Sequence, residues 1–346
     1  MRSKRKIEKY LRYYVTRNFG AVVEYIDEWA PWLWRIQLID GKLIAAKYQP
    51  LARRTRHTES DVLELERELL DFLVGKNCLV PSWVGCDKKT GFAFYEWVGD
   101  TTLDDYAQKD ILSARKIIPR VVDSFKLIDN NINDMQGHLA SKVIPGGEKS
   151  DLLSLWRVVT ERAKWGAYAL CNHLGLPSPT KKIITELDVI CNDLALQDPR
   201  LGCSDFNARN IIIGDKESPY FIEFAKLNWD WTERRLVQYT TSIGSRKHRG
   251  NLRALLYKKN TRETLNIALV DAHQIVFMLN GAAEVCFAFE KEKKPFRKYF
   301  RPTYLHSLRR RLIVFANVLS EHFSLEAQLC EIRSTFSIEK KGVTIE

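Results

Sequence analysis

Three polar residues are spaced around one apolar hairpin in the segment LGCSDFNARNIIIGDKESPYFIEFAKL, residues 201–227. Asp205 precedes the first apolar run, Asn210 stands at its start, and Glu223 closes the second run. A turn-forming segment rich in Gly, Asp, Ser and Pro separates the two runs. One hairpin would bring the amide and the carboxylate together, and Mg²⁺ prefers such oxygen ligands. With a second carboxylate near an acceptor hydroxyl, these are components that phosphoryl transfer needs.

Two further charged residues could complete such a site. Lys47 ends the run LIAAKY, and Glu66 lies inside the helical run VLELERELLDFL. Taken singly, each is more typical of an exposed charge at a strand end or on the wet face of a helix. A cation that holds phosphates is, however, what the hairpin residues lack. We therefore keep Lys47 and Glu66 as candidate site residues, because the same chain also carries the polar residues of the hairpin.

The first hundred residues alternate between helical and strand patterns. Apolar residues at helical spacing predict a helix over 7–15, and short strands follow between 22 and 48, with a hairpin turn at Asp40-Gly41. A second helix is expected over 58–73 and a strand over 91–99. This part of the chain is thus expected to form a small sheet with one accompanying helix.

The remainder of the chain is mainly helical in period from Leu103 onward. Loops are expected at 143–151 and 175–182, and the hairpin at 211–223 is the one clear β element that this half predicts. An apolar stripe predicts a long helix over 304–319. The order of elements indicates two lobes, and a cleft between lobes is a usual place for a ligand.

Composition narrows the functional classes. The chain has 346 residues, 45% of them hydrophobic, and its seven cysteines include no CxxC pair, which argues against a disulfide framework or a zinc site. We find no apolar run of the roughly 18 residues that span a bilayer, so we expect a cytoplasmic protein with no membrane partner. The net charge of +11 favours an anionic partner: a nucleotide, a phosphorylated metabolite or a nucleic acid.

From about Val22 to Tyr239 the sequence resembles the aminoglycoside phosphotransferase and choline kinase group of the protein-kinase-like superfamily. That group carries H-x-D-x-x-x-x-N, a strand, a turn, and a strand ending in I-D. This chain has C-S-D-F-N-A-R-N, then III, a turn, and FIEF. The resemblance implies that Asp205 is the catalytic aspartate and Asn210 a magnesium ligand, with Glu223 in the place of the main metal-binding aspartate.

The resemblance extends into the first part of the chain. It implies that Lys47 is the lysine that contacts the nucleotide phosphates and that Glu66 is its ion-pair partner on the helix. The segment FYEWVGDTTL is similar to the connector of that family. The backbone around Glu96, Trp97 and Val98 would then hydrogen-bond adenine.

The fold implied by the resemblance is α+β and bilobal, protein-kinase-like, with a small antiparallel β lobe of about five strands and a mainly helical large lobe. We expect the nucleotide-binding lobe with its leading helix over 1–98, and the helical lobe with the catalytic hairpin and the substrate side over 99–346. The implied activity is transfer of a phosphoryl group from ATP, with Mg²⁺, to a hydroxyl of a small molecule, for which the net charge favours an anionic one. Asp205 would accept the hydroxyl proton.

Two alternatives stay open at this point. One is a pseudokinase that binds a nucleotide or a partner without turnover. The other is a kinase acting on RNA, which only the charge favours. Basic segments at 53–57 and 245–250 could hold an anionic substrate, and basic residues interleaved with aromatic ones at 291–302 could contact nucleic acid. In a helical region such aromatic residues more often pack in the core.

Three departures from the family pattern bear on activity. Cys203 replaces the family's histidine, and we interpret it as a small buried hydrophobe rather than a nucleophile. Glu223 replaces an aspartate, which moves the carboxylate out by one methylene. The turn that should cover the phosphates, residues 27–34, contains no glycine, although glycine lets backbone amides approach phosphates closely.

Overall fold

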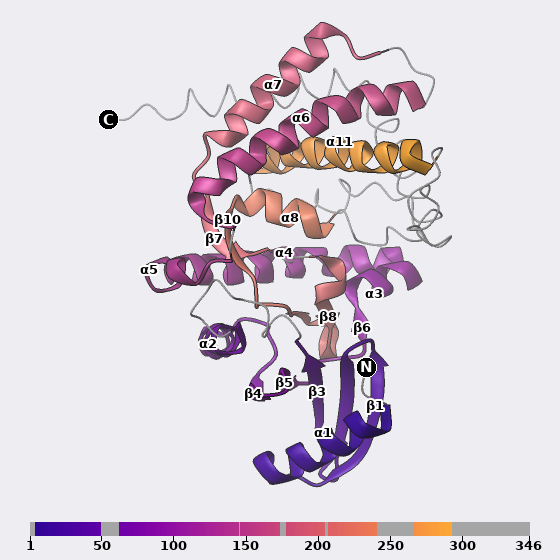
Figure 1. Cartoon of the computed structure of the whole chain (residues 1–346), viewed down its shortest axis with the longest axis vertical. Coiled ribbons are helices and arrows are strands. Elements are labelled where there is room, and N and C mark those ends of the chain that lie inside the picture. The colour runs from indigo at the N-terminus through magenta and orange to yellow at the C-terminus, as the bar shows by residue number, and fades with distance from the viewer. Residues whose placement is uncertain are drawn as a thin grey trace.

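The chain forms a small sheet-bearing lobe joined to a larger helical lobe (Figure 1). The structure is a computed structural model that describes residues 4–49, 62–144, 146–173, 178–204, 207–240 and 266–292. Asp205, the basic segments at 53–57 and 245–250, most of the segment 291–302, and the expected helix over 304–319 lie outside these ranges. Within them, no helix combines the length and the apolarity that crossing a bilayer requires.

The small lobe is built on a five-stranded antiparallel sheet, the number of strands expected for it. Its strands follow the order β1-β2-β3-β5-β4. Their bounds, with those of the two helices that flank the sheet, are β1 (Val23–Ala30), β2 (Leu33–Leu38), β3 (Leu43–Tyr48), β4 (Trp83–Asp87), β5 (Phe92–Glu96), α1 (Lys4–Phe19) and α2 (Val62–Gly75). The turn at Asp40-Gly41 joins β2 to β3, and Gly41 has φ +82°, so that expected hairpin is confirmed.

Alternate residues of the strands enter two different cores, because successive side chains of a strand point to opposite faces. Ala46 on β3 and Phe94 on β5 join the core beneath α1, where Leu11 is fully buried. Ala45 and Tyr95 face the other way, into the core that contains the apolar side of α2. The residues that line the cleft between the lobes therefore come from this second face.

The large lobe is mainly helical, and its helices stack away from the sheet in Figure 1. They are α3 (Leu103–Lys109), α4 (Ile111–Asp134), α5 (Gln136–Leu139), α6 (Lys149–His173), α7 (Lys181–Ala195), α8 (Thr232–Thr240) and α11 (Ile267–Glu292), with short 3₁₀ turns η2 (Ala140–Lys142), η3 (Ala208–Asn210) and η4 (Asp215–Glu217). Helices α6, α7 and α11 share a core of their own.

Three short strands accompany the expected hairpin, so the prediction of a single β element in this half is wrong. The hairpin is β8 (Ile211–Ile213) with β9 (Pro219–Phe221), and β6 (Thr101–Thr102) adds to its edge. A separate pair joins β7 (Arg200–Cys203) to β10 (Leu227–Asp230). Strands of two to four residues are too short to display a period of two, and tertiary pairing alone reveals them.

One core links the two lobes. Leu63 and Leu70 of α2 share it with Phe125 of α4 and with Ile211 and Phe221 of the hairpin. All five side chains are essentially excluded from solvent. Burying large apolar side chains on both sides of the cleft stabilises the orientation of the hairpin relative to the sheet.

Candidate active site

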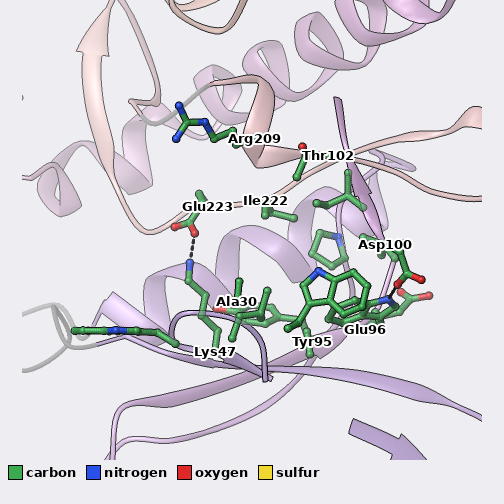
Figure 2. Close-up of a pocket in the computed structure, with 18 of the residues that line it drawn as sticks. Ala30, Lys47, Tyr95, Glu96, Asp100, Thr102, Arg209, Ile222 and Glu223 are labelled. Atoms are coloured by element: carbon green, nitrogen blue, oxygen red, sulfur yellow. Dashed lines mark hydrogen bonds and ion pairs between the residues drawn. The ribbon is translucent and has the colours of Figure 1, made fainter. Parts of the chain in front are cut away.

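A cavity of about 470 Å³ lies between the sheet and the hairpin. Its walls come from the β1–β2 turn, from β3 and α2, from the connector that follows β5, and from the hairpin. Figure 2 shows Lys47 and Tyr95 rising from the sheet side, with Glu223 and Ile222 opposite them. Residues from both lobes are thus in position to contact one ligand.

Lys47 and Glu223 meet across this cavity. The Nζ of Lys47 forms an ion pair with the Oε1 of Glu223, marked by the dashed line in Figure 2. Lys47 stands near the end of β3, paired with Leu33 on β2 and Ala93 on β5, so its backbone is held on both sides. Their two side chains are 25% and 24% exposed, which leaves both in reach of a ligand in the cavity.

Glu223 takes a backbone conformation that is rare for its residue type. Its φ is +74°, the left-handed region that costs an L-residue with a side chain about 1–2 kcal/mol. It lies two residues after the end of β9, and the amide of the intervening Ile222 donates to the carbonyl of Asn210 over 3.0 Å. Asn210 and Glu223 are therefore neighbours across the open end of the hairpin, as the sequence predicts.

The chain before the hairpin is held by local hydrogen bonds. The Asn210 amide donates to the Asn207 carbonyl (2.9 Å), and the Asn207 side chain accepts from the Arg209 amide (3.0 Å). On the other side of Asp205, the Ser204 amide donates to the Lys226 carbonyl (3.0 Å). Asp205 itself lies outside the described residues, and its catalytic role stays a prediction.

Glu66 has partners other than the expected lysine. Its carboxylate accepts hydrogen bonds from Gln49 Nε2 (2.6 Å) and Tyr95 OH (2.8 Å) on Oε2, and from the Phe224 amide (3.3 Å) on Oε1. Burial raises the pKa of Glu66, while the nearby charge of Lys47 acts against that rise. The direct pairing expected between Lys47 and Glu66 is replaced by the pairing of Lys47 with Glu223.

The connector uses two of its three amides within the protein. The Glu96 amide donates to the Ser82 carbonyl (2.9 Å) and the Trp97 amide to the Leu43 carbonyl (3.2 Å). The Glu96 carboxylate also accepts a hydrogen bond from the Ser82 hydroxyl, over 2.8 Å. Among the described residues, no acceptor is recorded for the Val98 amide, and Val98 lines the cavity. Of the three connector residues, Val98 is the one whose amide is available to a ligand in the cavity.

Known structures of the same architecture match most of the chain. No protein-family model matches it, and no curated protein matches it in sequence. An aminoglycoside phosphotransferase from Alicyclobacillus acidocaldarius superposes with a TM-score of 0.56 at 10% identity, over 90% of this chain and 92% of the other. A choline/ethanolamine kinase family protein from Mesorhizobium loti reaches 0.54 at 8% identity, over 95% and 99%. The GDP complex of wild-type aminoglycoside 2′-phosphotransferase-IIIa also reaches 0.54, at 12% identity, over 91% and 99%.

The chain has a protein-kinase-like fold. The α+β, bilobal architecture implied by the motifs is thereby confirmed. At these identities the similarity extends to the fold alone. Function has to be argued from the site, because one fold supports many activities.

The turn over the cleft of this kinase-like fold is aromatic. Pro31 and Trp32 connect β1 to β2, and Trp32 has φ +73°, a conformation that glycine usually supplies. The Trp29 ring lies edge-on to that of Trp97 at 5.3 Å between centroids, and the Arg35 guanidinium stacks on Trp29 at 4.5 Å. The turn therefore presents indole rings to the cavity, where a glycine-rich turn would present amides.

Cys203 is fully buried at the end of β7, in agreement with its interpretation as a small hydrophobe. Its Sγ lies 3.9 Å from the carbonyl oxygen of Phe224, the residue after Glu223. A thiol is a weak hydrogen-bond donor. Cys203 thus packs against the backbone of the segment that follows Glu223 and does not line the cavity.

The donor chemistry around Glu223 fits a hard divalent cation. Asn210, which carries an amide oxygen, is bonded through its backbone to Ile222, the residue before the carboxylate-bearing Glu223. Within the described ranges, no three His, Cys, Asp or Glu side chains cluster as a closed metal site. Mg²⁺ usually binds through one or two protein oxygens and completes its shell with phosphate and water. The residues present suit that open type of site.

Three residues of the site were not predicted from the sequence motifs. Gln49 and Tyr95 hold Glu66, and Arg209 lines the cavity from the hairpin side. Gln49 could have been found, since it follows Lys47 by two positions and so shares its face of the chain. Tyr95 pairs across the sheet with Ala45, and only the strand register places it beside Glu66.

Proposed function

We propose that this protein is an ATP- and Mg²⁺-dependent phosphotransferase that acts on a hydroxyl of a small, anionic molecule. The observation that carries the proposal is the meeting of Lys47 and Glu223 from two lobes inside one cavity, with Asn210 beside Glu223. A lysine and a carboxylate facing one cleft, with a second oxygen-bearing residue next to them in the hairpin, suit the binding of a metal–polyphosphate complex. The kinase-like fold and the nucleotide-bound relative of that fold support the same reading.

Each residue has a distinct task in this scheme. The Val98 amide and the carbonyls of the connector would hydrogen-bond the edge of the base. Trp97 and Trp29 would provide apolar walls of the base pocket. Lys47 holds the phosphates, which requires it to exchange Glu223 for a phosphate oxygen. Asn210 and Glu223 would hold Mg²⁺. When bound, the cation offsets the negative charge that develops on the transferred group.

Asp205 is proposed to accept the proton of the acceptor hydroxyl. Arg209 adds a cation close to the same segment, three residues before Ile212 in the hairpin. Its side chain is 53% exposed and its Nε lies 3.8 Å from the buried Asp104 carboxylate, so it is only loosely held. An exposed guanidinium at the hairpin side of the cavity suits an acceptor that carries a carboxylate or phosphate. We also propose that the boundary between the lobes lies after Val98, with the nucleotide-binding lobe over 1–98 and the helical lobe over 99–346.

The test is a nucleotide titration with and without Mg²⁺, followed by ATP turnover with hydroxylated acceptors of both charge signs. We expect Mg²⁺ to tighten ATP binding and an anionic acceptor to be phosphorylated. Asp205→Asn should leave ATP affinity nearly unchanged and reduce turnover by roughly two to four orders of magnitude, the scale of general-base assistance. Turnover that survives this change would refute the assignment of Asp205.

A pseudokinase is the second candidate, favoured by the direct pairing of Lys47 with Glu223 and by the aromatic turn. In that case ATP affinity would ignore Mg²⁺ and no acceptor would be phosphorylated. An RNA-directed kinase would instead show binding that weakens steeply with salt. The expected slope is about −0.7 in log affinity per log salt for each neutralised phosphate of a single strand.

A further inference from the structure

The backbone of Phe224, the residue after the proposed metal ligand Glu223, is held at its amide and at its carbonyl by two buried side chains. The amide of Phe224 donates to Oε1 of Glu66 over 3.3 Å, and its carbonyl faces the Cys203 Sγ at 3.9 Å. Phe224 is itself fully buried. The Phe224 amide belongs to the peptide group that joins Phe224 to Glu223, and the φ of Glu223 is +74°. Whatever fixes the Phe224 peptide also fixes the direction in which the Glu223 side chain leaves the backbone.

Glu66 is well placed to act as that anchor. It is 2% exposed, and its helix α2 is bound to the core through the fully buried Leu63 and Leu69. Gln49 and Tyr95 donate to its other oxygen, Oε2, and so set the rotation of the carboxylate. Burial and the Glu66 charge keep Tyr95 protonated, because they raise its pKa well above 10. Tyr95 is therefore a stable donor.

We propose that Glu66 is the positioning residue of Glu223. It fixes the left-handed backbone at Glu223 through the Phe224 amide, and it does not serve as the ion-pair partner of Lys47. The consequence for metal binding rests on the proposed function. The structural part, that Glu66 anchors the Phe224 peptide, stands on the hydrogen bonds alone.

All three groups donate to the carboxylate, two of them to Oε2 and one to Oε1. A glutamine at position 66 would present one oxygen and one amide group. The Phe224 amide can only donate, whereas Gln49 and Tyr95 would both have to reverse their hydrogen bonds to accept from the new amide. Because a lost partner leaves a buried donor unsatisfied, Glu66→Gln should loosen either the Phe224 amide or the pair formed by Gln49 and Tyr95. Releasing that pair frees the side chain to rotate, and the anchor is then lost as well.

The experiment compares wild type with Glu66→Gln, Tyr95→Phe and the control Glu64→Gln, an exposed residue of the same helix. The first readout is hydrogen–deuterium exchange of the segment that contains Phe224. The second is ATP affinity with and without Mg²⁺. Glu66→Gln should speed exchange at Phe224 at least tenfold and remove most of the tightening by Mg²⁺, while metal-free affinity stays within about threefold. Tyr95→Phe should give a smaller change in the same direction, and Glu64→Gln should match wild type.

Unchanged exchange at Phe224 in Glu66→Gln would overturn the proposal, whatever happens to affinity. A loss of metal-free affinity equal to that of Lys47→Ala, with the Mg²⁺ effect retained, would also overturn it, because Glu66 would then act through the lysine. If Glu66→Gln does not fold, Tyr95→Phe is judged by the same exchange criterion. If wild type shows no Mg²⁺ effect, the proposed function fails, while the exchange at Phe224 still decides the role of Glu66.

Discussion

The ammonium group of Lys47 on strand β3 pairs with the carboxylate of Glu223, which lies 176 residues further along the chain, after strand β9. The pair joins the small lobe to the hairpin of the large lobe across the cavity (Figure 2). The two charges offset each other where phosphates and a cation would otherwise bind. In the proposed function, a metal–nucleotide complex would insert between them, with a phosphate bound to the lysine and the cation bound to the glutamate.

Replacing Lys47 by alanine should weaken ATP binding roughly ten- to hundredfold. The reason is the loss of a charge-assisted contact to phosphate, which is worth about 1.5–3 kcal/mol. Isothermal titration measures the affinity, and circular dichroism checks the fold. Lys42→Ala is the matched control, because Lys42 is largely exposed at the β2–β3 turn and lies outside the cavity. Equal ATP affinity in the two variants would show that Lys47 does not contact the nucleotide.

Changes at Glu223 should separate metal binding from nucleotide binding. Glu223→Ala removes a proposed Mg²⁺ ligand and should abolish phosphoryl transfer, leaving at most metal-independent nucleotide binding. Glu223→Asp keeps the carboxylate and should retain some turnover, with a changed Mg²⁺ requirement, since Mg²⁺ is strict about ligand geometry. The measurement is turnover as a function of Mg²⁺ concentration. A Glu223→Ala variant with full turnover would contradict the assignment.

Gly99 should tolerate no larger residue, because it fits between the connector and the hairpin. It has φ +152°, and a Cβ there would lie 2.8 Å from the carbonyl oxygen of Ile213. Gly99→Ala should destabilise the protein by about 1–3 kcal/mol, the usual cost of a strained backbone conformation. Urea denaturation monitored by fluorescence measures this. Gly137→Ala is the control, because nothing lies within 4 Å of its added Cβ and its helix favours alanine.

The buried pair of Asp129 and Arg235 should be essential for the stability of the large lobe. Both side chains are almost fully buried, and Arg235 Nη1 lies 2.9 Å from Asp129 Oδ1. Arg235 also donates to the backbone carbonyls of Arg200 and Asn228. Asp129→Ala would leave a buried guanidinium without its counter-charge, at a cost of about 3–5 kcal/mol. Denaturant titration should show this loss, whereas Asp40→Ala, at an exposed pair, should change stability little.

His273 should make the large lobe sensitive to mild acid. It is buried between the rings of Trp156 and Trp231, and burial lowers its pKa well below the ordinary value of 6.5, with the charge of Arg234 adding to the effect. Below pH 6.5 the unfolded chain binds a proton that the folded chain excludes, so stability falls as pH decreases. The slope from this one group approaches about 1.4 kcal/mol per pH unit.

The variant His273→Phe keeps an aromatic ring between the two tryptophans and removes the titrating group. Its free energy of unfolding, measured between pH 7 and pH 5, should fall less steeply than that of wild type. Parallel curves for the two proteins would show that His273 is not responsible. The comparison at pH 7, where the unfolded histidine is mostly neutral, separates the packing cost of the substitution from the pH effect.

The sequence by itself determined the small lobe and the order of its site residues. The alternating apolar residues of β2, the turn signal that precedes β3 and the apolar stripe of α2 are local patterns, which can be recognised without a structure. The hairpin placed Asn210 beside Glu223 for the same reason, because a short turn dictates which residues end up opposite each other. These inferences depend on neighbours within about twenty residues along the chain.

Only the tertiary structure decided the partners of the charged groups. Glu66 bonds to the amide of Phe224, 158 residues away, and Lys47 pairs with Glu223 rather than with Glu66. The short strands β7 and β10 likewise exist because they pair with each other. Which acceptor a buried donor reaches depends on how two lobes pack against one core, to within a few tenths of an ångström. The spacing of residues along the chain does not predict the distance between such a donor and its acceptor.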